Sequence, residues 1–411
     1  MSTDRYKVTT QYMKKELFRA LMLQGYVIRR DRVDLPTLDT KEDIREAHLI
    51  QRRSRLKVEQ LFYKSRGTDL IDDFFANGHD VNPSSFDPEI IPVESGKWTG
   101  ELFRVATLLW SIPVSRGYGR RMRFLVMDKF NGKLVGIIAL GDPVFNLKVR
   151  DQHIGWNSNQ RKERLFNVMD AYVLGAVPPY NELLAGKFIA GVLLTNEIRD
   201  QFRKKYQNTS TIIQGIVKPA DLVLITTTSA LGRSSIYNRV FYDNNSIRRF
   251  LMEKIGYTSG YGHFHIPEEI FELMRKFLEE RDDNYANGHQ FGNGPNWRMR
   301  VIRKTMQYLG YSKTPVLHHG IKREVFVAPL ARNFREYLKG ETGCPDFLPL
   351  TLEEYGTYFV ERFMVPRYDR IGGISHHYVS NVKAHIEQLL TEDINRPLQS
   401  DSLNFSPSQL M

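Results

Sequence analysis

Two groups of polar residues in this 411-residue chain combine types and spacings that could bind an anion or a polyanion. The first group lies in Asn167–Leu194 and Asp221–Val240, where apolar strands give way to turn-forming and helix-starting residues. Free backbone N–H groups at such joints are suited to holding phosphate. The candidate residues of this anion pocket are Asn181, Gly186, Lys187, Arg233, Ser234, Ser235 and Tyr237.

Gly232–Arg239 contains the most explicit chemistry of this pocket, because it follows a strand and is expected to open a helix. Ser234 or Ser235 could cap that helix, and Arg233 would add positive charge beside the free N–H groups. A capped helix with a packed tyrosine and no ligand explains the same residues. This structural interpretation is the favoured one.

The second group is basic and aromatic, and it lies between Asn296 and Glu324. Arg300 shares a helix face with Arg303 and Lys304, at spacings of three and four residues. Cations beside aromatic side chains are typical of contact with a nucleic-acid backbone, and solvated surface charge is the alternative. The candidate nucleic-acid-binding residues are Trp297, Arg298, Arg300, Arg303, Lys304, Lys322 and Arg323.

The histidines and the single cysteine do not predict a metal site. His318 and His319 are adjacent, so on a strand they would point to different faces, and the same argument applies to His376 and His377. Cys344 is the one cysteine of the chain, which excludes an internal disulfide and a cysteine-based zinc site. We therefore expect no bound metal.

A further polar segment, Arg150–Asn157, is expected to be a loop after a strand, with Asp151, His153 and Trp156 close together. An Asp–His pair could orient an imidazole for proton transfer, and a tryptophan could stack on a base. No partner nucleophile is evident, so a structural role is favoured. Whether the chain is an enzyme stays open, and its catalytic residues are unknown.

The elements that must position these residues follow a mixed α+β pattern. Met122–Asp128 and Leu134–Asp142 alternate as strands around the tight turn Asn131–Lys133, which predicts an antiparallel hairpin. Beyond the hairpin we expect helices over residues 181–202, 236–252, 268–281 and 297–310, and strands over residues 221–229 and 323–331.

Four segments are expected along the chain. Residues 77–98 are rich in Asn-Gly, Asn-Pro and Ser-Gly pairs, which are typical of loops and mark the first boundary. The segments are a helical basic N-terminal region (1–94), an α/β core (95–266), a helical and basic C-terminal extension (267–394) and a flexible tail (395–411).

Composition favours a cytoplasmic protein with no membrane association. The sequence has no run of about 18 apolar residues and no apolar segment near its start that would resemble a secretory signal. The formal net charge is +11, from 58 Lys and Arg against 47 Asp and Glu. A surplus of this size fits both a nucleic-acid partner and an ordinary solvated surface.

The order of hairpin, strand, helix, strand and helix over residues 122–257 resembles the GNAT acyltransferase fold. That resemblance implies that residues 177–187, VPPYNELLAGK, correspond to the loop that holds the acyl-CoA pyrophosphate, and that Tyr237 corresponds to a general acid. Glu182 stands near the position of an Arg or Gln in that loop, and Gly186 is its one glycine. We therefore expect no acyl-CoA binding and no other cofactor.

More specifically, residues 95–340 resemble the protein A family of the Druantia antiviral defence system. The resemblance rests on the ordered phrases GDPVFNLKVRDQHIGWN, NVMDAYVLGAVPPYNELLAGK, TTTSALGRSSIYNRV, GPNWRMRVIRK and HHGIKREVFVAPLA. It implies bacterial antiphage defence, in an operon with other components that include a large helicase-like protein.

Together these features predict an α+β protein with a GNAT-like mixed sheet, acting in antiphage defence and binding nucleic acid, with DNA favoured over RNA. One alternative is an acyltransferase-like or DNA-processing enzyme that uses a pocket between Val177 and Tyr237. The other is a non-catalytic scaffold subunit for operon partners.

Overall fold

The protein is described by a computed structural model that covers residues 8–29, 33–114, 119–210, 215–244, 247–288, 295–311 and 315–394. The chain divides into two compact units: unit 1 holds residues 1–54, 259–322 and 392–411, and unit 2 holds residues 55–258 and 323–391. Whether residues 95–266 form a domain of their own stays a prediction. The expected tail lies outside the described residues, as do residues 289–294 just before Pro295.

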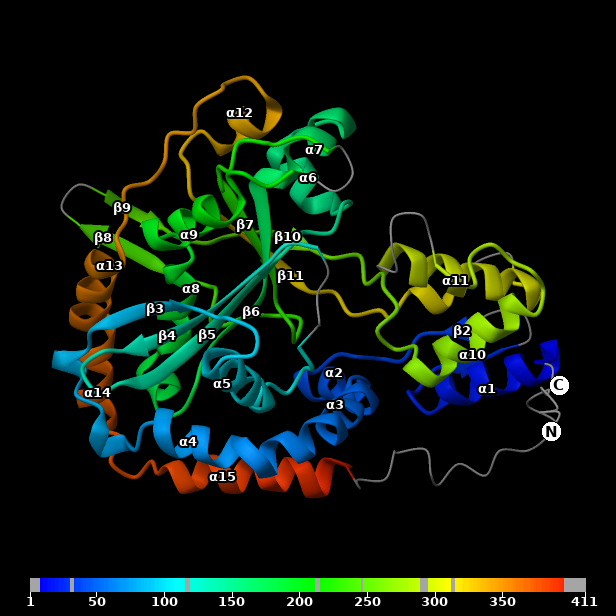
Figure 1. The fold of residues 1–411 in the computed structure, drawn as a ribbon, viewed down its shortest axis with the longest axis horizontal. Coiled ribbons are helices and arrows are strands. Elements are labelled where there is room, and N and C mark those ends of the chain that lie inside the picture. Colours follow the sequence, from blue (N-terminus) through cyan, green and yellow to red (C-terminus); the bar gives the residue numbers. More distant parts are fainter. Residues whose placement is uncertain are drawn as a thin grey trace. The chain divides into compact units, whose positions relative to one another are not determined.

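Among the described residues, unit 2 is built on a seven-stranded sheet in the order β10-β11-β7-β6-β5-β4-β3 (Figure 1). Neighbouring strands are antiparallel except β6 and β7, which run parallel. This sheet confirms the mixed α+β class and the predicted hairpin. The strands are β3 (Pro88–Pro92), β4 (Arg121–Asp128), β5 (Lys133–Gly141), β6 (Val168–Ala176), β7 (Leu224–Thr228), β10 (Glu253–Tyr257) and β11 (Glu324–Pro329).

The parallel pair of β6 and β7 is short. Its register joins Val168 to Leu224 and ends with Asp170 opposite Thr226, although β6 continues to Ala176. A register shift in the neighbouring β5–β6 pairing, between Ala139 and Leu140, adds twist at the same level. The two strands therefore diverge just beyond Asp170 and Thr226, and side chains from both strands meet at this point.

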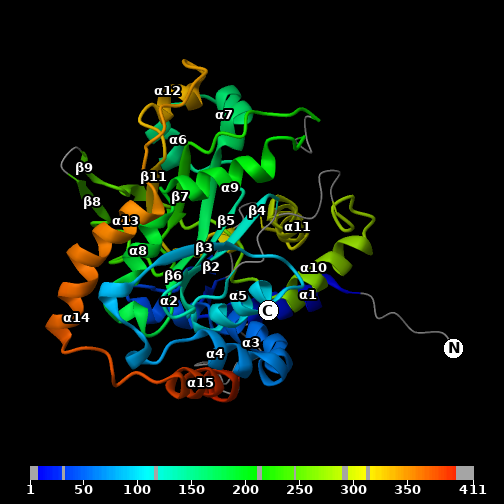
Figure 2. The same cartoon turned by 60° about the vertical axis from the view of Figure 1, so that its left-hand side comes forward.

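Helices cover the sheet on both faces (Figure 1). α8 (Ala185–Val192) packs on β5 and β6, where Phe188 joins the largest apolar core, and α5 (Trp98–Ala106) packs on β4 and β5. α13 lies beside the edge strand β3, and α14 follows it (Figure 2). Of the helices named above, α13 comprises Leu352–Phe359 and α14 comprises Val365–Ile371. The other helices wholly or partly in unit 2 are α3 (Leu49–Phe62), α4 (Thr68–Phe74), α6 (Lys148–Ile154), α7 (Ser158–Arg164), α9 (Asn196–Tyr206), α12 (Phe334–Lys339) and α15 (Val379–Gln388).

Unit 1 has a small core of its own. The buried faces of its helices meet around Leu17, Phe18, Phe271 and Ile302, and the side chain of Thr9 caps the first helix by accepting from Tyr12 N. The elements of unit 1 are α1 (Thr10–Met22), β1 (Val27–Ile28), β2 (Val33–Asp34), α2 (Lys41–Ala47), α10 (Glu268–Glu279) and α11 (Pro295–Tyr308). None of the helices in the described ranges is long and apolar enough to span a bilayer.

Three expected elements differ from the structure. The predicted helix over 236–252 is wrong, because β8 (Phe241–Asn244) and β9 (Ile247–Phe250) form an antiparallel pair there, as suits the aromatic and β-branched residues of both strands. The predicted helix over 181–202 is broken by Leu184, which has a φ of 62°. Residues 150–154, expected as part of a loop, lie in α6 (Lys148–Ile154).

Candidate functional site

The cations of α11 have different partners in the structure. The guanidinium of Arg298 lies 2.9 Å from the Glu268 carboxylate and 3.8 Å from the centre of the Phe271 ring. Its charge is therefore neutralised by a carboxylate, and its plane packs on an aromatic face. Arg298 joins α11 to α10, and it is less available to a phosphate than the cations that follow it.

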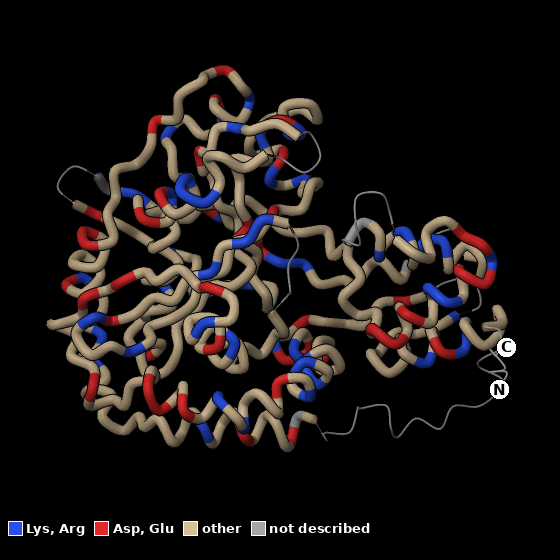
Figure 3. Tube along the Cα trace, viewed as in Figure 1, with Lys and Arg blue, Asp and Glu red and all other residues tan. Residues whose placement is uncertain are grey.

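Arg300, Arg303 and Lys304 lie farther along α11. Figure 3 shows that Lys and Arg recur along this helix. Arg300 donates to the hydroxyl of Tyr285 at 3.1 Å, and Arg303 donates to the hydroxyl of Tyr261 at 3.2 Å. Within the described part of the chain, none of the three cations has a carboxylate partner. These three cations and two tyrosines are called the α11 basic face below.

Trp297 lies in the core of unit 1, at the start of α11. Its side chain is 7% exposed, its indole N–H donates to the Tyr285 carbonyl at 2.7 Å, and its ring packs edge-on against Phe271. The indole therefore has no open face on which a base could stack. Tyr261, which is 41% exposed, is the more accessible aromatic side chain beside these cations.

Lys322 and Arg323 are neighbours in the sequence but belong to different units. Lys322 is exposed in unit 1. Arg323 is half-buried in unit 2, where burial lowers the pKa of its guanidinium to about 10 and its backbone N–H donates to Thr258 Oγ1. The cation available at this joint is therefore Lys322.

The expected anion pocket is occupied by the chain itself. The ammonium of Lys187 donates to the carbonyls of Ser235, Ile236 and Asn238, and burial lowers its pKa. A side chain at Gly186 would meet Ile236 at 3.6 Å. Residues 235–238 therefore pack on the start of α8 and use the three donors of Lys187.

Ser234 caps a turn in this pocket. Its hydroxyl accepts from the backbone N–H groups of Ile236 and Tyr237 at 3.1 Å, and its own N–H donates to the Glu324 carboxylate at 2.9 Å. Ser234 thus makes capping contacts, but the prediction that it caps a helix is wrong, because the capped element is a turn and no helix follows. Arg233, Ser235 and Asn181 are exposed around it.

Tyr237 packs against the sheet. Its ring meets Phe326 of β11 edge-on at 5.4 Å, and burial raises the pKa of its hydroxyl to about 12. The Thr227 side chain is its hydrogen-bonding neighbour, and Thr227 Oγ1 also donates to the Ala171 carbonyl at 2.7 Å. Tyr237 therefore stands at the place where β6 and β7 separate.

A titratable group that sequence reasoning missed lies at the same place. Asp170 of β6 accepts a hydrogen bond of 2.6 Å from Thr226 Oγ1 of β7. Burial raises the pKa of the Asp170 carboxyl to about 6, against the opposing effects of the Thr226 hydroxyl and the Arg150 charge. Asp170, Thr226, Thr227 and Tyr237 are called the β6–β7 divergence site below.

A carboxyl that titrates near neutral pH can act as a proton donor or acceptor, and such groups are concentrated at functional sites. The signal in the sequence is slight: Asp170 is the one charged residue in the otherwise apolar stretch from Val168 to Val177. Its environment depends on a strand more than fifty residues away, which the local pattern does not reveal.

The raised pKa of Asp170 predicts a dependence of stability on pH. Between pH 4 and 6 the folded state holds a proton that the unfolded state, with a pKa near 3.8, has already released. The free energy of unfolding should therefore fall as pH rises through this window, by up to about 3 kcal/mol in total, and then level off. Asp170→Asn, which keeps the acceptor for Thr226, should remove this contribution and stabilise the protein above pH 6.

Urea unfolding of both proteins at pH 4.5 and 7.5 measures the effect. Asp73→Asn is the matched control, since Asp73 is exposed and its loss should leave the pH dependence unchanged. An Asp170→Asn variant with the pH dependence of the wild type would show that this carboxyl is not the one that titrates.

Arg150–Asn157 forms a structural network and not a catalytic pair. Asp151 Oδ1 accepts from the guanidinium of Arg150 at 2.7 Å and from the indole of Trp156 at 3.0 Å. His153 instead contacts Arg335 at 2.8 Å, and burial together with that charge lowers the pKa of its imidazole. The favoured structural role for this segment therefore agrees with its contacts.

The two pairs of adjacent histidines differ in their contacts. His319 accepts from Ile321 N at 3.1 Å, and the ring of His318 faces Tyr261. His376 and His377 both reach Glu182. The expectation that adjacent histidines do not converge is wrong for this second pair, because their segment is a loop and does not have the alternation of a strand.

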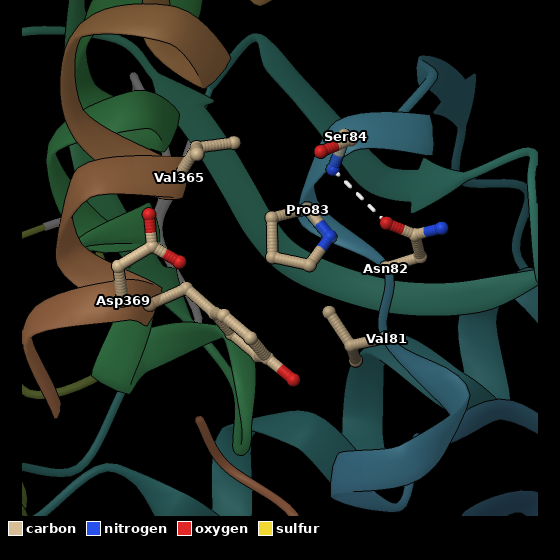
Figure 4. A pocket seen from close by; sticks show the side chains of 7 residues that line it. Val81, Asn82, Pro83, Ser84, Val365 and Asp369 are labelled. Carbon is tan, nitrogen blue, oxygen red and sulfur yellow. Dashed lines mark hydrogen bonds between the residues drawn. The ribbon is translucent and has the colours of Figure 1, made fainter. Parts of the chain in front are cut away.

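A surface pocket of about 220 Å³ also lies in unit 2. Figure 4 shows Val365 and Asp369 of α14 on one side and the turn at Pro83 on the other. No sequence pattern predicts this pocket, and none of the candidate residues lines it. Its lining residues are Val81, Asn82, Pro83, Ser84, Val365, Tyr368 and Asp369.

Comparison with known proteins identifies the family of this chain. Residues 38–340 match the family model described as Druantia protein DruA. The chain is also 45% identical over 371 residues to Druantia protein DruA of Escherichia coli (strain UMEA 4076-1), an alignment that covers 90% of this chain and 87% of that protein. The chain therefore belongs to the Druantia protein DruA family. No solved structure matches it.

Proposed function

We propose that this chain is a component of a bacterial antiphage defence system and binds nucleic acid, with DNA favoured, through the α11 basic face. Membership of the Druantia protein DruA family supports the defence role and a place in a multi-component operon. A helicase-like protein of the operon is a further proposed partner. The contacts of α11 support the choice of surface.

One observation carries the nucleic-acid proposal: the cations of this face contact hydroxyls and not carboxylates. Arg300 and Arg303 are exposed, and their partners are the neutral hydroxyls of Tyr285 and Tyr261. A phosphate can therefore bind these guanidinium groups without displacing an acid. Tyr261 adds a partly exposed ring that could stack on an unpaired base.

The proposal is tested by measuring binding as a function of salt. Fluorescence anisotropy titrations of the intact chain with labelled single- and double-stranded DNA and RNA should give a log affinity that falls linearly with log salt. Each phosphate contact should add about 0.7 to 0.9 to the slope. Absence of salt-dependent binding to all four probes would reject nucleic acid and favour the scaffold role.

A GNAT-like core is a second element of the proposal. It is supported by the strand order, by the single parallel pair β6–β7 of the described sheet, by the divergence of these strands and by α8 after β6. The β6–β7 divergence site would then be the active site of a DNA-processing or acyltransferase-like enzyme. Asp170 is its candidate general base or acid.

Acyl-CoA is not expected to bind such a core. Lys187 already donates to three carbonyls, and Glu182 places a carboxylate beside the start of α8. Calorimetric titration with acetyl-CoA should show no binding in the low-micromolar range. An affinity in that range would contradict the expectation and favour the acyltransferase alternative.

The defence role is tested in cells that carry the complete operon. Deleting this gene should weaken protection against phage, and full protection without it would reject the role. Arg233→Glu tests the exposed side of the expected anion pocket, and Asp170→Asn tests the divergence site. A folded Asp170→Asn protein that protects as well as the wild type would remove Asp170 from any enzymatic proposal.

A further inference from the structure

Three potential metal ligands from two distant segments of unit 2 meet at one place. Glu182 lies in a short helical turn (Tyr180–Leu183) before α8, and His376 and His377 follow α14. Glu182 Oε2 is 3.5 Å from His376 Nε2, and Glu182 Oε1 is 3.1 Å from His377 Nδ1. In the described ranges, this is the one group of such residues whose ligand atoms all lie within 4.8 Å of one another.

The distances match the geometry of a transition-metal site. Imidazole nitrogen and carboxylate oxygen bind Zn²⁺ at about 2.0 to 2.2 Å, so two such ligands at a tetrahedral angle lie about 3.3 to 3.5 Å apart. The separations of 3.1 Å from Glu182 Oε1 and 3.5 Å from Glu182 Oε2 are close to this value, and one ligand atom from each of the three side chains lies within 4.8 Å of the others. An ion could therefore enter with small movements of the side chains.

The backbone that carries the histidines is held in place. Gly372 and Gly373 end α14 with φ of 72° and 84°, a conformation that favours glycine. The His377 carbonyl accepts from Gly78 N at 2.7 Å. Gly78 is required there, because a Cβ would lie 1.7 Å from the Ile374 carbonyl oxygen. The ligand loop is thus positioned before any ion binds.

The backbone of the carboxylate ligand is held as well. Arg367 of α14 donates from Nε to the Glu182 carbonyl at 3.1 Å, which joins the turn before α8 to the helix before the histidines. Nε2 of His377 is buried and has no hydrogen-bond partner among the described residues. The contact with Glu182 therefore leaves this imidazole incompletely satisfied, and an outer partner such as water could complete it.

We propose that Glu182, His376 and His377 form a site for a divalent transition-metal ion, with Zn²⁺ as the best fit. Two imidazoles and one carboxylate are a donor set of zinc sites that keep a fourth position open for water. A hydrogen-bonded carboxylate–imidazole cluster without an ion is the competing explanation. It needs at least one protonated imidazole for a full ion pair, whereas the metal site uses neutral imidazoles.

The test is metal binding by the intact chain after treatment with chelator. Calorimetry with ZnCl₂ should give one site per chain, and CoCl₂ should produce the intense visible absorption of a tetrahedral Co²⁺ centre, displaced by Zn²⁺. His376→Ala is the safest variant, because this side chain is 68% exposed and its loss should not unfold the protein. It should weaken Zn²⁺ binding more than 10-fold, and Glu182→Gln should do the same.

His385→Ala is the matched control, since His385 is an exposed histidine on α15 of the same unit. It should bind Zn²⁺ as tightly as the wild type does. The proposal is overturned if the wild type binds neither ion at micromolar concentrations. It is also overturned if the folded His376→Ala and Glu182→Gln variants keep the wild-type affinity, because the ion would then occupy another place.

Discussion

Replacing Arg300, Arg303 and Lys304 together by alanine is expected to weaken nucleic-acid binding by roughly 100-fold or more at 0.1 M salt. Each cation that contacts a phosphate contributes about 0.7 to 0.9 to the slope of log affinity against log salt, so the slope should flatten by about two to three units. The structure favours these three because they have no carboxylate partner in the described part of the chain. Anisotropy titrations between 0.05 and about 0.3 M salt measure both quantities.

A loss of two cations elsewhere in unit 1 separates local contact from general attraction. Lys15→Ala with Arg19→Ala removes two exposed cations from α1 of the same unit. This control should change the slope by much less than one unit. Tyr261→Ala separates stacking from charge, because it should lower affinity for single strands at an unchanged slope. Equal losses in the α1 and α11 variants would contradict a localised interface.

The second large effect is expected from Arg150→Ala, which should lower the free energy of unfolding by about 3–5 kcal/mol. The Arg150 side chain is fully buried, and it donates to the carbonyls of Val144 and Phe145 and to the carboxylate of Asp151. Its removal takes one donor from each of these acceptors, although the Asp151 carboxylate keeps its hydrogen bonds from Trp156 and Arg161. Burial lowers the pKa of Arg150, and the Asp151 carboxylate opposes this effect. These hydrogen bonds therefore stabilise the charged guanidinium in the interior.

Urea unfolding at pH 7 measures this effect, with Lys148→Ala as the control. Lys148 is exposed on the same helix, α6, so its loss should change the free energy of unfolding by no more than about 0.5 kcal/mol. A change in the Arg150→Ala variant no larger than in the control would mean that the network contributes little. The slope of the urea transition shows whether both variants unfold from an equally compact state.

Local patterns were sufficient for the elements that depend on neighbours in the chain. The alternation of apolar residues around Asn131–Lys133 predicted the β4–β5 hairpin, and the 3.6-residue pattern predicted α10 and α11. The phrases shared with a known family predicted the membership that the comparisons confirm. The prediction for residues 236–252 was wrong because their local pattern is compatible with a helix, whereas β8 and β9 form there by pairing with each other.

At the candidate sites, the sequence does not predict which neighbouring side chain each candidate residue contacts. Six cations lie close together in the sequence around α11 and Lys322, yet only contacts distinguish Arg298, which meets Glu268, from Arg303, which meets Tyr261. Trp297 is aromatic and beside cations, but the packing of α11 on α10 buries it. The spacing of residues sets which side of a helix they occupy, and the neighbouring helix decides whether that side is free.

The sequence by itself determined the fold class, the family and the polar character of the joints after β6 and β7. Only the tertiary structure decided which of these polar groups are already satisfied. It gave Lys187 three carbonyl partners, raised the pKa of Asp170 by burying its carboxyl against the sheet, and brought Glu182 to two histidines almost two hundred residues away. The physical reason is that burial and hydrogen bonding depend on long-range contacts, which residue order does not specify.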